Sequence, residues 1–122
     1  MEQWGVRYWV DTEFQDDGER LHVLSVGVVG EDGREFYAVC ADFPFPTANQ
    51  WHHDNTLPLL PARDDPAWAD RATIAERLRD FIGDTQPEFW AMCSPWDWLA
   101  VVRLFGRVED LPDGWPMIAF DL

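Results

Sequence analysis

The sequence contains no lysine, and its nine arginines face 23 acidic residues, so its formal net charge is -14. Nucleic-acid binding normally depends on basic contacts to phosphate groups, and a field of this sign repels polyanions. A broad basic surface for nucleic acid is therefore excluded. Any role on nucleic acid has to be local, carried by a small arginine cluster, metal ions or aromatic stacking.

Long apolar runs and closely spaced cysteines are also missing. The longest apolar runs are strand-sized, whereas about 20 residues are needed to span a membrane. Residues 1–4 include an acidic residue and no basic region before an apolar stretch, so no secretory signal is expected. The two cysteines, Cys40 and Cys93, form no metal-binding motif and lie in apolar runs. This pattern predicts buried, reduced thiols in a cytoplasmic protein with no membrane partner.

The composition of the chain predicts one folded domain over residues 1–122. Hydrophobic residues make up 47% of the sequence and eight residues are tryptophan, which is enough for a single core. Runs rich in β-branched and aromatic residues predict three strands, at 5–13, 21–29 and 34–41. Short loops containing Gly and Asp join them, as is typical of an antiparallel meander.

The middle of the chain, residues 42–72, is interrupted by five prolines. A loop of this length in a compact domain tends to be functional or to contain a short helix. Its apolar residues predict that it packs back on the body of the protein. His52 and His53 do not share a face in a helix or a strand, so we interpret His52, His53 and Asp54 as a surface loop, not as metal ligands.

The last third of the sequence predicts two helices and two strands. Thr73 and Glu76 have the spacing of a capping box for a helix that ends at Gly83. A strand at 88–93 then leads into a helix at 94–105, with Ser94 as N-cap and Gly106 as its end. A final strand is expected at 117–122.

Three carboxylates are candidates for chemistry. Asp11 and Glu13 stand two residues apart at the end of the first strand, so their side chains point to the same face. Two neighbouring carboxylates repel each other, and a hard divalent cation such as Mg2+ would offset that repulsion. Asp97 falls in the first turn of the later helix. It is either half of a capping box with Ser94 or a third carboxylate beside Asp11 and Glu13.

Three antiparallel strands followed by helix, strand, helix and strand are the order expected of a ribonuclease H-like α/β fold with a mixed sheet. Within that order the sequence resembles a family of bacterial 3'-5' exoribonucleases, found in mycobacteria among others, of the DEDD exonuclease superfamily. The resemblance covers nearly the whole chain. It is carried by residues 8–14, 24–29, 32–39, 57–61, 89–98, 111–112 and 120–122.

This resemblance implies that Asp11 and Glu13 form the first exonuclease motif and Asp97 the second, as catalytic residues and metal ligands. The expected cofactor is a pair of Mg2+ or Mn2+ ions. Asp11 would bridge both ions, Glu13 would hold the ion nearest the nucleophile, and Asp97 would support the second. Hydrolysis by two metal ions needs an activated water and a stabilised leaving oxygen.

The family's third motif, a His followed by an Asp on a C-terminal helix, lies beyond the strand that contains Asp121, and this sequence stops before it. Asp121 matches a strand position and is not the missing ligand. None of His22, His52 and His53 is in the right part of the chain to be the general base. The resemblance therefore implies a metal site that is only partly formed and an activity that could be weak.

Three hypotheses of function follow. The first is a metal-dependent 3'-5' exoribonuclease-like hydrolase acting on RNA or short oligonucleotides, completed in one version by a second chain such as a homodimer partner. The second is a catalytically inactive acidic binding or inhibitory protein on the same fold, which would act as a decoy for a basic protein partner. The third is a sequence from which the segment carrying the rest of the site is missing.

Overall fold

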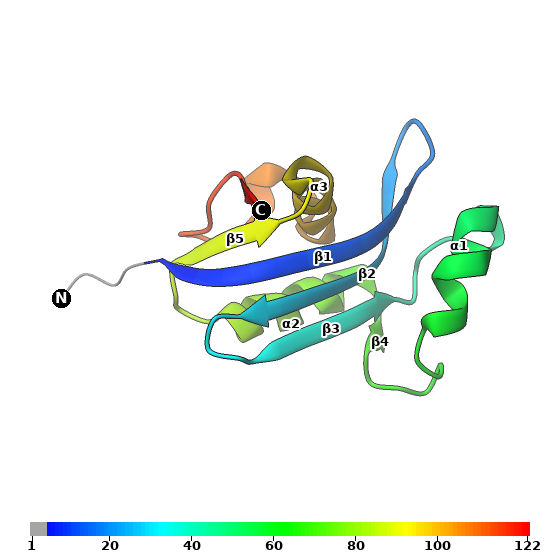
Figure 1. Ribbon diagram of the computed structural model, residues 1–122, viewed down its shortest axis with the longest axis horizontal. Coiled ribbons are helices and arrows are strands. Elements are labelled where there is room, and N and C mark those ends of the chain that lie inside the picture. Colours follow the sequence, from blue (N-terminus) through cyan, green and yellow to red (C-terminus); the bar gives the residue numbers. More distant parts are fainter. Residues whose placement is uncertain (1–4) are drawn as a thin grey trace.

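The computed structural model describes residues 5–122, so the expectation for residues 1–4 lies outside the described residues. Three strands come first in the described chain, and they pair as an antiparallel meander, as predicted (Figure 1). These strands are β1 (Val6–Asp16), β2 (Leu21–Gly30) and β3 (Glu35–Cys40).

Three more strands complete a six-stranded sheet in the order β4-β3-β2-β1-β5-β6. The strand β5 (Pro87–Ala91) lies parallel to β1, and the two edge strands, β4 (Trp68–Ala69) and β6 (Phe120–Asp121), run parallel to β3 and β5. The edge strand β6 is shorter than the predicted strand at 117–122. This mixed sheet confirms the α/β class expected of a ribonuclease H-like fold.

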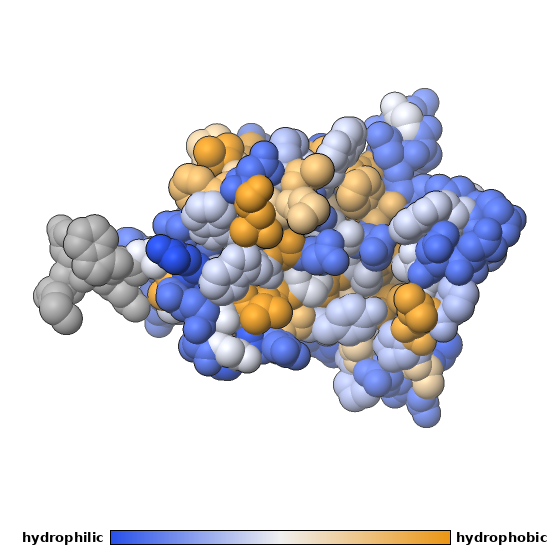
Figure 2. Space-filling view, in the orientation of Figure 1, coloured by the Kyte–Doolittle hydropathy of each residue, from blue (hydrophilic) through white to orange (hydrophobic). Residues whose placement is uncertain are grey.

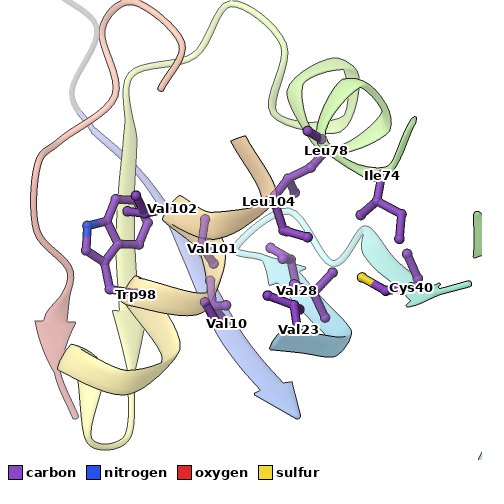
Figure 3. Close-up of a cluster of buried hydrophobic side chains, with 14 of the residues drawn as sticks. Val10, Val23, Val28, Cys40, Ile74, Leu78, Trp98, Val101, Val102 and Leu104 are labelled. Atoms are coloured by element: carbon purple, nitrogen blue, oxygen red, sulfur yellow. The ribbon is translucent and has the colours of Figure 1, made fainter. Parts of the chain in front are cut away.

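Two helices, α2 (Arg71–Ile82) and α3 (Ser94–Phe105), pack on one face of the sheet (Figure 1). Strand residues alternate between the two faces, so the even-numbered residues Tyr8, Val10 and Thr12 of β1 are buried beneath the helices. Within residues 5–122, no helix combines the length and the apolar character needed to cross a bilayer. The core contains, among others, Val10, Val23, Val28, Cys40, Ile74, Leu78, Trp98, Val101, Val102 and Leu104 (Figure 3).

The opposite face of the sheet is not covered by α2 or α3, and apolar residues gather on it (Figure 2). Trp9, Val29 and Trp90 lie in register on three adjacent strands, since Trp9 pairs with Val29 on β2 and with Trp90 on β5. The Trp90 ring stacks on that of Phe120, with 4.9 Å between the ring centroids. We refer to this side of the sheet as the open face.

The irregular region, residues 42–72, contains the short helix α1 (Gln50–Asn55). A short helix was one of the two possibilities expected for a loop of this length. His52 is only 3% exposed, so its assignment to a surface loop was wrong. Its Nε2 atom lies 2.8 Å from the carbonyl oxygen of Phe14, and its Nδ1 atom lies 3.0 Å from Thr56 Oγ1. These bonds fasten α1 to the end of β1, and Gln15 adds two more, to Thr47 and Asn49.

The start of α2 differs from the prediction. The helix begins at Arg71, and the Asp70 carboxylate accepts a hydrogen bond of 2.8 Å from the backbone N–H of Thr73. Asp70 is therefore the N-cap, and the predicted capping box of Thr73 and Glu76 was wrong because Thr73 already lies in the first turn. The end of the helix is as predicted, with Gly83 at a φ of 66°.

The start of α3 also differs. Cys93 is the N-cap residue, with a left-handed φ of 54°, and it is exposed, so burial of the thiols holds for Cys40 only. Burial raises the pKa of the Cys40 thiol to about 12. Ser94 is the first helical residue, and its backbone N–H donates to Asp121 Oδ1 at 2.7 Å. A carboxylate from β6 therefore caps α3 in place of the Ser94 side chain.

Replacing Leu78 with alanine should lower the free energy of unfolding by about 2–5 kcal/mol, because Leu78 is fully buried and its removal leaves a cavity between α2 and the sheet. The matched control is Leu59→Ala, since Leu59 is 82% exposed, and its effect should stay within about 0.5 kcal/mol. Urea unfolding measures both values. Equal unfolding midpoints for the two variants would contradict this description of the core.

Candidate functional site

Asp11 and Glu13 lie on the open face of β1, while Thr12 between them is buried on the helix side. This is the arrangement that strand alternation predicts. Asp11 is paired with Gly27 of β2, and Glu13 with Ser25. Because Gly27 has no side chain, the space beside the Asp11 carboxylate stays open; a Cβ atom there would meet nothing closer than 3.9 Å.

A β-bulge interrupts the pairing of β1 and β2 directly after Glu13. Such bulges bend a strand and re-aim its side chains. Beyond the bulge, the Phe14 ring stacks on the Trp96 ring of α3, with 6.1 Å between centroids and 19° between planes. The Phe14 carbonyl oxygen can only accept, so His52 Nε2 carries the proton and donates to it. The backbone next to Glu13 is thus held from both α1 and α3.

Asp97 lies in the first turn of α3 and is 8% exposed. Its Oδ1 atom accepts two hydrogen bonds from Thr12, one from the backbone N–H at 3.1 Å and one from the hydroxyl at 2.6 Å. The carboxylate therefore binds β1 and does not cap its own helix. Of the two alternatives for Asp97, the capping box with Ser94 was wrong, and the structure brings Asp97 beside the residue between Asp11 and Glu13.

The carboxylates influence one another electrostatically. The pKa of Glu13 is raised, first by burial and then by the negative charges of Asp11 and Asp97, while the nearby His52 acts in the opposite direction. The pKa of Asp97 is also raised, again mainly by burial and in part by Asp11, against the effect of its two bonds from Thr12. Like charges close together and partly desolvated favour protonation or the binding of a cation.

A cleft of about 270 Å³ opens beside Asp11 and Glu13, between the open face and the segment that follows α1. Its wall combines hydroxyl and amide groups with apolar side chains. Sequence reasoning did not single out this wall, although the expectation that a long loop tends to be functional pointed to the right region. Besides the two carboxylates, the lining residues are Thr12, Ser25, Gly27, Tyr37, Asn55, Thr56, Leu59 and Leu60.

The donor atoms of this site fit a hard divalent cation, which prefers carboxylate oxygens and water. Asp11 and Glu13 offer their carboxylates on one face, and Asp97 has one oxygen that Thr12 does not use. Within residues 5–122, however, no three His, Cys, Asp or Glu side chains are grouped so that together they could hold one ion. The chemistry of these side chains suits a hard divalent cation, whereas their spacing in residues 5–122 does not bring three of them onto one ion.

His22, His52 and Asp121 serve other contacts, and His53 is exposed on α1. His22 Nε2 lies 2.8 Å from Asp17 Oδ2 in the β1–β2 hairpin. This contact involves none of the three candidate carboxylates. Asp121 is engaged by the N-terminus of α3. His52 approaches Glu13 closely enough to affect its pKa, but both of its ring nitrogens are already hydrogen-bonded.

Replacing Glu13 with glutamine should raise the free energy of unfolding at neutral pH. Because the folded state raises the pKa of Glu13 above its ordinary value of 4.5, ionisation of this group costs stability as the pH rises through the raised value. The gain should disappear below about pH 4, where the carboxyl is protonated in both states. Urea unfolding at several pH values measures it, with the exposed Glu76→Gln as control. A gain that persists in acid would contradict the electrostatic explanation.

Replacing Thr12 with valine should lower the free energy of unfolding by about 1–3 kcal/mol. The change removes the hydroxyl donor and leaves the buried Asp97 oxygen with the backbone N–H alone. Thr12→Ser retains a hydroxyl and should recover most of the loss, which separates the hydrogen bond from packing. Thermal or urea unfolding gives both numbers, and equal losses in the two variants would argue against the bond.

Comparison with known proteins adds an independent line of evidence. No protein-family model matches the chain. Two curated relatives from two strains of Mycobacterium tuberculosis, each named 3'-5' exoribonuclease, are 37% identical to it over 120 residues. The match covers 96% of this chain and 71% of each relative. Identity at this level over nearly the whole sequence shows that the chain belongs to the mycobacterial-type 3'-5' exoribonuclease family.

Proposed function

We propose that this protein is a metal-dependent 3'-5' exoribonuclease that hydrolyses phosphodiester bonds at the 3' end of RNA or short oligonucleotides. The observation that carries the proposal is its relationship, across 96% of the chain, to proteins named 3'-5' exoribonuclease. Three carboxylates support it: Asp11 and Glu13 line one cleft, and the negative charge of Asp11 helps to raise the pKa of both Glu13 and Asp97.

In this proposal, Asp11 and Glu13 would hold a divalent cation from the open face, and Asp97 would assist through the oxygen that does not bind Thr12. Bound Mg2+ or Mn2+ supplies an activated water nucleophile and stabilises charge on the leaving 3' oxygen. Thr12 acts as a positioning residue, since its two bonds orient the Asp97 carboxylate toward β1. A carboxylate fixed in this way loses little freedom when it binds a ligand.

His52 is a positioning residue in the same proposal. Its Nε2–H donates to the Phe14 carbonyl, and its Nδ1 contacts Thr56, so the ring has no nitrogen available to accept a proton from water. Proton removal by a well-placed base typically contributes about 10²- to 10⁴-fold in rate. We therefore expect slow turnover by this chain alone, unless another group supplies the base.

The cleft beside Asp11 and Glu13 would receive the nucleoside at the 3' end of the substrate. Ser25, Asn55 and Thr56 offer hydrogen-bonding groups, and Leu59 and Leu60 offer apolar contact. Tyr37 contributes both an aromatic ring and a phenol whose pKa is raised mainly by partial burial. A site of this kind holds a flat base and a polar sugar without requiring a basic surface.

Replacing Asp11 with asparagine should reduce RNA degradation at least about 10²-fold, because it removes a charged ligand from the proposed metal site. The assay follows a 5'-labelled RNA in Mg2+ or Mn2+, in which 3'-5' degradation appears as a ladder of shortened labelled products. EDTA should stop the reaction of the parent protein.

The matched control for this assay is Glu76→Gln, which removes one exposed carboxylate from α2, remote in the sequence from the three candidates. Its rate should equal that of the parent. Degradation that persists in Asp11→Asn, or that continues in EDTA, would overturn the proposed function.

A further inference from the structure

A second cleft, of about 610 Å³, lies on the helix side of the sheet, between α3, the start of α2 and the β1–β2 hairpin. Three of the nine arginines of the chain line it, namely Arg20, Arg71 and Arg103. We propose that this arginine cleft binds phosphate groups of the RNA strand on the 5' side of the bond that is hydrolysed. The proposal rests on the proposed function and adds a second contact region for the same substrate.

The fold brings the three arginines together from distant parts of the sequence. Arg71, at the first position of α2, donates from Nη1 to the carbonyl oxygen of Arg103 at 3.1 Å, so its guanidinium lies against the last turns of α3. Arg103 donates from Nη1 to the carbonyl oxygen of Gly106. These bonds to neutral carbonyls orient the guanidinium groups without neutralising their charge, and they leave other N–H groups of each fork for a ligand.

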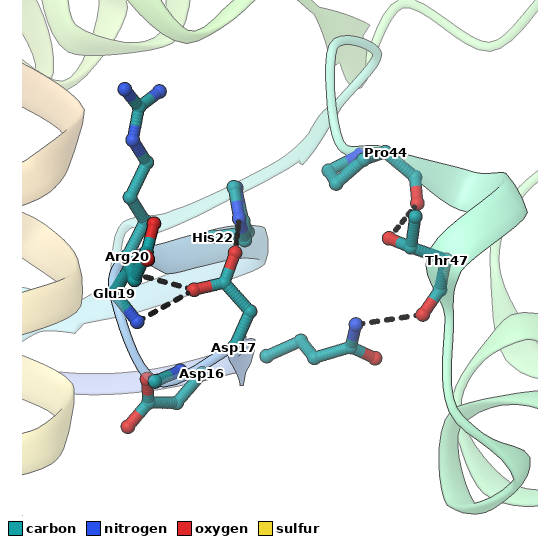
Figure 4. A network of polar contacts seen from close by, with 9 residues as sticks. Asp16, Asp17, Glu19, Arg20, His22, Pro44 and Thr47 are labelled. Atoms are coloured by element: carbon teal, nitrogen blue, oxygen red, sulfur yellow. Dashed lines mark hydrogen bonds and ion pairs between the residues drawn. The ribbon is translucent and has the colours of Figure 1, made fainter.

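No carboxylate oxygen of residues 5–122 lies within 4.0 Å of any of the three guanidinium groups. Among residues 5–122, every ion pair within 4.0 Å involves Arg7, His22, Arg34 or Arg107. The Arg20 side chain makes no hydrogen bond to any of residues 5–122. Its guanidinium extends away from the Asp17 carboxylate (Figure 4). Arginines that are close together and not paired with carboxylates are the groups that bind phosphate in a bidentate manner.

Acidic residues also line the cleft, but two of them are occupied by backbone donors. Asp16 Oδ1 accepts from the N–H of Gly18 at 2.9 Å, and Asp42 Oδ2 accepts from the N–H of Arg71 at 3.2 Å. With Glu19, these carboxylates match the three arginines in number. The cleft therefore has no formal excess of negative charge, although the chain as a whole carries -14.

One stripe of α3 leads from the arginine cleft to Trp96, which lies next to Asp97 in the sequence. Trp96, Leu99 and Arg103 are spaced by three and four residues, so they share a helix face, and all three line the cleft. Trp96 precedes Asp97 directly and stacks on Phe14, which follows Glu13. At 1.5 Å per residue, Arg103 lies about 10 Å along the helix from Trp96, within reach of a short single strand.

The chemistry of this stripe suits a single strand of nucleic acid. Trp96 is 52% exposed and offers an aromatic face on which any base can stack, while the arginines meet the backbone phosphates. Neither contact depends on the base sequence. RNA that extends past the 3'-terminal nucleotides should therefore bind more tightly than a dinucleotide, and the additional affinity should decrease with salt.

The test compares Arg20→Gln with Arg79→Gln. Both remove one exposed arginine and the same charge, but Arg79 lies on α2 outside the cleft. Binding of a fluorescent single-stranded oligo(A) RNA and of a fluorescent adenine dinucleotide is measured by anisotropy in EDTA. For the long RNA, we expect Arg20→Gln to weaken binding about threefold to tenfold and to lower the slope of log K against log salt by about 0.7. Dinucleotide binding should not change.

A second pair of variants checks the role of charge at Arg71. Arg71→Gln should weaken binding of the long RNA to a similar extent, whereas Arg71→Lys keeps the charge and should retain most of the affinity. Thermal unfolding of each variant separates loss of binding from loss of the bond to the Arg103 carbonyl. A variant that melts like the parent and binds the long RNA less tightly supports the arginine cleft.

Three results would overturn the inference: equal affinities of Arg20→Gln and Arg79→Gln for the long RNA, equal losses for the long RNA and the dinucleotide, or no measurable binding of the long RNA by the parent. The proposed function is tested separately, by degradation in Mg2+. If the parent degrades RNA and Arg20→Gln binds it as tightly as Arg79→Gln, only the arginine cleft is wrong. If the parent binds RNA through the cleft but does not degrade it, only the exonuclease proposal is wrong.

Discussion

The paired hydrogen bonds from Thr12 to the Asp97 carboxylate are the contact on which the rest of the site depends. They join the middle of β1 to the first turn of α3 across 85 positions of sequence. Because the contact is buried, its loss would leave a desolvated carboxylate with too few donors. It also fixes the start of α3, so that Trp96 lies over Phe14 and the side of the helix beyond Trp96 faces the arginine cleft.

The candidate site contains ionised carboxylates that lower the stability of the fold and that serve the proposed chemistry. Burial, with the nearby Asp11 charge, raises the pKa of both Glu13 and Asp97, which means that the ionised forms of these two groups oppose folding at neutral pH. The fully buried side chains beneath β1 and β2, such as Val26 and Leu104, supply the compensating stability. A net charge of -14 adds to this opposition, and the pairing of some arginines with nearby carboxylates relieves it only locally.

Local patterns predicted much of this architecture. The meander and the bounds of α3 depend on turns, hydrophobic spacing and helix stop signals that lie within a few residues of one another, and they were predicted correctly. The shared face of Asp11 and Glu13 follows from strand alternation alone. The resemblance to the exoribonuclease family led from these elements to Asp97, and the relatives confirm the family.

Two of the errors concern side chains with partners distant in the sequence, and a third is local. The N-terminus of α3 is capped by Asp121 from β6, and this removes the need for a capping box at Ser94. His52 is buried because Phe14 and Thr56 satisfy its two ring nitrogens, and a local reading of adjacent histidines does not detect that. Asp70 caps the N-terminus of α2 through the backbone N–H of Thr73, so the predicted capping box of Thr73 and Glu76 does not form.

Both outermost strands of the sheet, β4 and β6, are only two residues long. A sheet edge presents unpaired N–H and C=O groups, and long, flat edges are templates for the addition of strands from other molecules. Edges this short offer few such groups in a row. The two outermost strands therefore give an approaching strand little backbone on which to begin, and the longer free edge belongs to β3, of which β4 covers only Val39 and Cys40.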